Sequence, residues 1–132
     1  MRRTDVIGGV TAAVFLLNAG LISGAQAGPW EDGMAAYNRG DYVPAIRLFR
    51  PLAEAGNPKA QSVIGVMYRK GEGVAKSSSR AFIWFSLAAK RGDAKAKTEL
   101  RQVSEGMTPA EISQARDMMQ ACEASNYRAC EY

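Results

Sequence analysis

The sequence predicts an all-α fold, a short right-handed α-solenoid of two to three stacked helical hairpins. Apolar residues recur at the three- and four-residue spacing of helices, and glycine or proline separates these segments. The pattern also repeats, because like residues recur 36 positions apart, a period typical of helical-hairpin arrays. The matching pairs are Gly56 and Gly92, Ala45 and Ala81, Phe49 and Phe85, Ala53 and Ala89, and Ala60 and Ala96.

Residues 1–27 have the pattern of a secretory signal peptide. Two arginines precede a mostly apolar run from Val6 to Ile22, and Ala25-Gln26-Ala27 offers the small residues of a cleavage site. An uncleaved membrane anchor is the alternative, because the run is close to the shortest spanning length. We therefore expect residues 28–132 to form one exported repeat domain, in the periplasm of a Gram-negative bacterium or outside the cell.

The first unit is predicted over residues 30–56. Its first helix ends near Gly40, and Asp41 can cap a second helix from Tyr42 to Ala55. Pro51 is expected to bend that helix or to loosen its third turn. The apolar stripe of the second helix consists of Ala45, Leu48, Phe49, Leu52 and Ala53.

The second unit, residues 57–92, has the clearest hairpin pattern. Two glycines, Gly71 and Gly73, supply the positive φ angles that a tight reversal needs. Ser77 or Ser78 can cap the following helix. Gly65 costs helix propensity, so we expect a partner helix to cross closely at that point.

The third unit, residues 93–125, is degenerate, and residues 126–132 form a capping tail. Gly106 ends its first helix, and Thr108-Pro109-Ala110-Glu111 predicts a capping box at the start of its second. A final repeat that departs from the pattern is expected where the array meets water. The last helix is lined by Ile112, Ala115, Met118, Met119 and Cys122.

The spacing of residues 60–92 resembles the Sel-1-like repeat, a helical hairpin related to the tetratricopeptide repeat. The motif is Ala60-x-x-x-Ile64-Gly65-x-x-Tyr68-x-x-Gly71-x-Gly73, then Arg80-Ala81-x-x-Trp84-x-x-x-Ala88-Ala89-x-x-Gly92. The family usually has an acidic residue after the glycine turn, where this chain has Ser77. A serine at this position can still cap the following helix. The resemblance implies that the signature residues pack between helices: Ala60, Ile64, Gly65, Tyr68, Gly71, Gly73, Ala81, Trp84, Ala88 and Gly92.

Cys122 and Cys130 are the two cysteines of the chain. In an exported protein two cysteines normally pair, so we expect a structural disulfide. The cysteine-rich branch of the Sel-1-like family has disulfides with this C-x7-C spacing, usually in every unit, whereas this chain has one. A redox pair is the alternative, although catalytic dithiols favour C-x-x-C spacing.

No catalytic residue, metal site or cofactor is predicted. The sequence has no histidine, the commonest general base and metal ligand. Its formal net charge is +4, with the charges interspersed, so no basic patch for nucleic acid is expected. The resemblance to the cysteine-rich branch implies an alternative, a β-lactam-binding or β-lactam-hydrolysing enzyme. Ser77-x-x-Arg80 matches the S-x-x-K motif of such enzymes only superficially.

The predicted function is a noncatalytic protein–protein interaction or adaptor module of the bacterial envelope. In related repeats the first helices of the units line a concave face that holds peptides or proteins. The partner is an unidentified protein or peptide, self-association is possible, and no stable membrane insertion is expected after signal cleavage. The residues expected to be displayed are Asn38, Arg39, Gln61, Ser62, Val66, Arg69 and Lys70.

The signal-peptide assignment predicts the first residue of the exported protein. Cleavage after Ala27 should give a chain that begins Gly28-Pro29-Trp30. N-terminal sequencing of the protein recovered from the envelope fraction measures this directly. A chain that retains Val6 to Ile22 would contradict cleavage and favour the membrane anchor.

Overall fold

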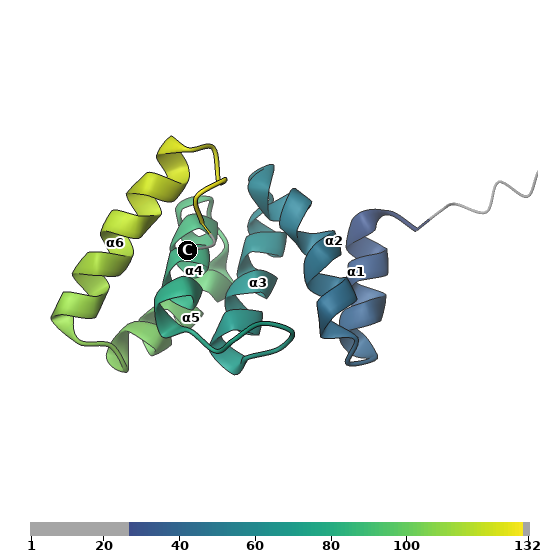
Figure 1. The fold of residues 1–132 in the computed structure, drawn as a ribbon, viewed down its shortest axis with the longest axis horizontal. Coiled ribbons are helices and arrows are strands. Elements are labelled where there is room, and N and C mark those ends of the chain that lie inside the picture. The colour runs from purple at the N-terminus through teal and green to yellow at the C-terminus, as the bar shows by residue number, and fades with distance from the viewer. Residues whose placement is uncertain (1–26, 131–132) are drawn as a thin grey trace, which may run out of the picture.

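The computed structural model describes residues 27–130, which form six α-helices and, over that range, no strands (Figure 1). The predicted all-α fold is confirmed. Apart from Ala27, the predicted signal peptide lies outside the described residues. The helices are α1 (Pro29–Asn38), α2 (Tyr42–Glu54), α3 (Pro58–Lys70), α4 (Ser78–Lys90), α5 (Ala94–Glu105) and α6 (Pro109–Ala124).

The helices pack in chain order into a short array. α1 packs against α2, and α3 packs against α4, so that each pair forms a hairpin. α2 also packs against α3 and α4 against α5, which joins one hairpin to the next. α6 packs against α4. Because the chain reverses after each helix, α1, α3 and α5 run in the same direction (Figure 1).

Five of the six helices end in the same backbone motif. A residue with positive φ lies just beyond the helix. The N–H group of the residue after it donates a hydrogen bond to the carbonyl oxygen five residues earlier in the chain, which is the Schellman arrangement. Gly40, Gly56, Gly71, Gly92 and Asn126 hold the positive-φ position. Four of these residues are glycine, which adopts this conformation without steric cost. α5 is the exception, since Gly106 follows it with a φ of −90°.

The closest approach of α3 and α4 occurs at Gly65. A Cβ atom added there would lie 2.7 Å from ring carbons of Phe85, closer than non-bonded carbons can approach. Phe85 and the neighbouring Trp84 are fully buried, so the ring has little room to move. The absence of a side chain at Gly65 therefore allows α4 to place its aromatic residues in the core.

The first hairpin uses the same arrangement. A Cβ atom added at Gly33 of α1 would lie 2.6 Å from the ring of Phe49 on α2. Phe49 is fully buried and also contacts the indole of Trp30, with ring centroids 5.3 Å apart. Phe49 and Phe85 stand 36 residues apart, so the sequence repeat corresponds to a repeated glycine–phenylalanine contact.

The loop between α3 and α4 joins the second hairpin to the first. The Tyr37 hydroxyl of α1 donates a hydrogen bond to the Glu72 carboxylate at 2.6 Å. Burial, followed by the bond to Glu72 and its negative charge, raises the pKa of Tyr37 well above its usual value of 10. Gly73, with a φ of +72°, lies against the backbone of Tyr42 at the start of α2. This loop is therefore part of the packing between hairpins.

The start of the second helix differs from the sequence expectation. Asp41 precedes α2, but its carboxylate makes no capping bond. It accepts a hydrogen bond from Arg39 Nε at 3.1 Å instead. Pro51 lies inside α2, which continues past it to Glu54. Capping is as expected in the later helices, where Ser77 accepts from Arg80 N and Thr108 and Glu111 form the capping box.

The C-terminal end is held by a disulfide between Cys122 and Cys130, both buried, with Cα atoms 4.7 Å apart. The predicted cysteine pair is confirmed. Tyr127, in the tail between them, packs under the guanidinium of Arg91, which also donates a hydrogen bond to its hydroxyl. Lys90 forms an ion pair of 2.6 Å with Glu123. The tail and α6 are thus fixed to the end of α4.

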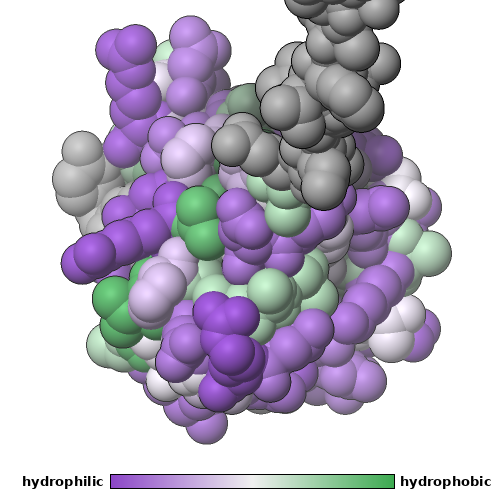
Figure 2. Space-filling model, turned by 90° about the vertical axis from the view of Figure 1, so that its right-hand side faces the viewer, coloured by the Kyte–Doolittle hydropathy of each residue, from purple (hydrophilic) through white to green (hydrophobic). Residues whose placement is uncertain are grey.

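The α1 end of the array presents a mostly hydrophilic surface where it is not grey (Figure 2). Across residues 27–130, Val43 is the one large apolar residue with an exposed side chain, at 47%. Polar end faces are what keep a short helical array from extending by stacking. No helix in this range combines the length and the apolar character needed to cross a membrane.

The contact at Gly65 generates a stability prediction. Alanine normally favours a helix over glycine by about 1 kcal/mol, but here its methyl group would displace the Phe85 ring. We expect Gly65→Ala to lower the free energy of unfolding by about 1–3 kcal/mol. Gly106→Ala is the matched control, because its φ is −90° and its nearest neighbour would lie at 3.6 Å. Equal stability of the two variants in urea unfolding would contradict the proposed close packing.

Candidate functional site

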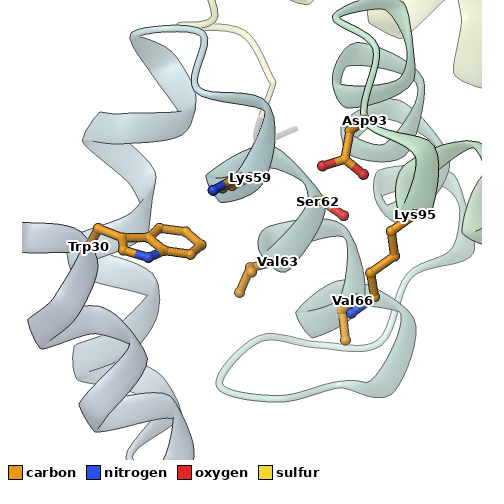
Figure 3. A pocket seen from close by; sticks show the side chains of 7 residues that line it. All are labelled: Trp30, Lys59, Ser62, Val63, Val66, Asp93 and Lys95. Carbon is orange, nitrogen blue, oxygen red and sulfur yellow. The ribbon is translucent and has the colours of Figure 1, made fainter.

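An open pocket, called the groove below, is lined by residues of the first helices of the three units, and its cavity has a volume of about 150 Å³. Trp30 of α1 forms one side, α3 forms the floor and centre, and the start of α5 forms the other side (Figure 3). The side chains that line it are Trp30, Lys59, Ser62, Val63, Val66, Asp93 and Lys95. The groove therefore combines three apolar side chains with a hydroxyl group, two ammonium groups and one carboxylate.

α3 turns one of its faces to the groove and the opposite face to α4. The four groove residues of α3 stand at positions i, i+3, i+4 and i+7, which share one side of a helix. Ile64 and Tyr68 lie on the other side and are fully buried. Val66 and Ser62 are themselves 8% and 5% exposed, so they form the floor, while Lys59 and Val63 stand higher and more open.

The three first helices begin at the same end of the groove. Trp30, Lys59 and Lys95 are each the second residue of their helix, so equivalent positions of successive units meet there. The local sequence fixes these starts. Asn57 caps α3 by accepting bonds from the Lys59 and Ala60 N–H groups. Asp93 caps α5 in the same way, by accepting a bond from the Ala96 N–H group, so the starts of α3 and α5 are fixed at equivalent positions.

The groove carries a surplus of positive charge. Lys59 and Lys95 have no acidic partner among residues 27–130. Asp93, the one acidic residue in the lining, caps α5, and its carboxylate accepts a bond of 2.7 Å from Ala96 N. Both lysines are exposed, so their charges are available to a bound partner.

The cavity is the size of one side chain. Pockets for drug-sized ligands usually measure roughly 300–1,000 Å³, whereas an apolar cavity of roughly 150 Å³ holds a benzene ring. The present cavity, about 150 Å³, thus matches a phenyl or isobutyl group. Its open rim leaves room for the main chain that would carry such a group.

Six of the seven residues expected on the displayed surface separate into three groups. Ser62 and Val66 line the groove, whereas Asn38 and Arg39 lie exposed beyond the end of α1. Arg69 pairs with Glu99 of α5 at 3.0 Å and Lys70 approaches Glu72 at 3.8 Å. The pair of Arg69 and Glu99 lies between α3 and α5 and so helps to join the second and third units.

The expected exposure is wrong for Gln61, Ser62 and Val66, which are buried. Gln61 is fully buried because α3 turns it toward the end of α2, where its amide donates a 3.0 Å hydrogen bond to the Ala53 carbonyl. Ser62 and Val66 face the groove but sit at its floor. The signature residues Ile64, Tyr68, Ala81, Trp84 and Ala88 are buried, in agreement with their expected packing between helices.

Sequence reasoning missed five of the lining residues: Trp30, Lys59, Val63, Asp93 and Lys95. One signal could have found three of them. Trp30, Lys59 and Lys95 each follow the first residue of a first helix, so aligning the helix starts would have brought them together. The inward position of Val63 follows from its being four residues after Lys59 and three before Val66.

The positions considered for catalysis have structural roles in this fold. Ser77 accepts a hydrogen bond from Arg80 N at 3.2 Å and caps α4. Within residues 27–130 no three acidic, cysteine or histidine side chains gather in a way that would hold a metal ion. The groove itself offers a ligand apolar, hydroxyl and charged side chains.

The second hairpin, with its glycine turn and its glycine–phenylalanine contact, is the unit that comparison with known families identifies. Residues 58–93 match the Sel1 repeat. This segment contains α3, α4 and the caps that follow each of them. Sel1 repeats are typically protein-interaction modules. The Sel1 repeat also supplies the centre of the groove, since four of the seven lining residues belong to α3.

Proposed function

We propose that this chain is a noncatalytic protein-interaction module of the bacterial envelope, and that the groove across α1, α3 and α5 binds the partner. One observation carries the proposal: a cavity of side-chain size opens where the first helices of three successive units meet. Such a cavity suits an anchor residue from another protein, because hot spots of interfaces are side chains that fill small pockets.

The arrangement of the Sel1 repeat supports this proposal. The residues that define the repeat are used for packing between α3 and α4, and the groove residues lie on the opposite face of α3. Binding can therefore change with the groove residues while the fold is maintained. The apolar run and small residues before Gly28 support a location in the envelope.

The proposal is tested by photocrosslinking in living cells. A photoreactive amino acid replaces Lys59 in the groove, and a matched variant carries it at Arg47, an exposed position on α2. We expect discrete crosslinked products from position 59, and few or none from position 47, on denaturing gels. Mass spectrometry then identifies the crosslinked protein.

Two results would contradict the proposal. Equal crosslinking from positions 47 and 59 would show that the groove is not the preferred contact. Crosslinks confined to position 47 would move the interface to the second helices of the hairpins. Both variants should unfold at the temperature of the unmodified protein, because both side chains are exposed.

A further inference from the structure

The lysines of the groove differ from other cationic side chains at contacts between helices. Arg69 and Lys90 each lie within 4 Å of a glutamate from another helix. Lys59 and Lys95 have no such neighbour within residues 27–130, although both line the cavity. Two ammonium groups are thus concentrated at a cavity whose single carboxylate already caps a helix.

The backbone adds to this positive potential. α1, α3 and α5 all begin at the end of the groove that holds Trp30, Lys59 and Lys95, and the N-terminus of a helix favours negative charge. Glu31 and Asp32 in the first turn of α1 oppose this effect, but neither lines the cavity. The lysine side chains therefore dominate the charge that a ligand in the cavity would meet.

The cavity between the lysines is apolar. Trp30, Val63 and Val66 form its walls and floor, and Figure 3 shows Lys59 and Lys95 on different sides of Val63. A ligand that used the whole groove would need an apolar group at its centre and negative charge beside it. In an extended chain neighbouring residues are about 3.3 Å apart, so acidic residues within one to three positions of the apolar residue can reach the rim.

We propose that the groove binds a partner segment in which one leucine- or phenylalanine-sized side chain is flanked by aspartate or glutamate. The apolar side chain fills the cavity, and the acidic residues pair with Lys59 and Lys95. This inference rests on the proposed function and adds the chemistry of the partner to it.

The test is a selection of random peptides, displayed on phage, against the protein purified from its native host. Peptides that bind should share an apolar residue with Asp or Glu within three positions. Their affinities are then measured by fluorescence anisotropy at low and high salt. Affinity should fall as salt rises, because exposed charge pairs are screened.

Three variants separate the apolar and the charged contributions. Val63→Trp fills the cavity without changing charge and should abolish binding. Lys59→Glu with Lys95→Glu replaces two attractions by two repulsions and should weaken binding at least about tenfold. The matched control, Lys97→Glu with Arg101→Glu, makes the same change in net charge at exposed positions of α5 outside the lining. It should weaken binding less than about threefold.

The outcomes distinguish the inference from the proposed function. The Val63→Trp variant should still unfold cooperatively. If it binds every selected peptide as tightly as the unmodified protein does, the groove is not a binding site, and both the proposed function and the partner chemistry are wrong. If peptides depend on Val63 but lack acidic residues, or if the groove lysines matter no more than the control pair, only the partner chemistry is wrong. Polyglutamate that bound as tightly as the selected peptides would also contradict the proposed partner chemistry. Self-association of the protein that Val63→Trp abolishes would contradict it as well.

Discussion

The contact between Gly65 and Phe85 is the constraint on which the rest of the structure depends. It lets α3 and α4 approach until the Phe85 ring lies against the α3 backbone, and it leaves Trp84 and Phe85 fully buried. A close, dry contact of this kind fixes the rotation of both helices about their axes, because any turn would open a cavity or force an overlap. The same contact in the first hairpin, between Gly33 and Phe49, orients α1 and α2.

Fixing the rotation of α3 determines which of its residues face the groove. With Ile64 and Tyr68 held against α4, Lys59 and Val63 have to lie on the opposite side. The helix-end motifs after α2 and α4 then set where α3 and α5 begin, so the first turns of these two helices align. A packing constraint in the core thus produces a repeated surface position, occupied by tryptophan in the first unit and by lysine in the next two.

Much of the fold could be predicted because its determinants are local. Positive-φ glycines, the Ser77 cap and the capping box at Thr108 act within a few residues, so their signals are visible in the sequence. The groove was predicted less well, because the direction of a side chain depends on contacts between helices. Gln61 seemed free to face outward, yet the rotation of α3 turns it toward the end of α2, where it bonds to Ala53.

The central claim is that the first helices bind and the second helices support them. Amide hydrogen exchange of the protein, with and without a selected peptide, tests it most directly. The claim predicts slower exchange on peptide binding in α3 and in the first turns of α1 and α5, with no change in α2, α4 and α6. Slower exchange confined to α2, α4 or α6 would place the binding surface on the other side of the array and contradict the claim.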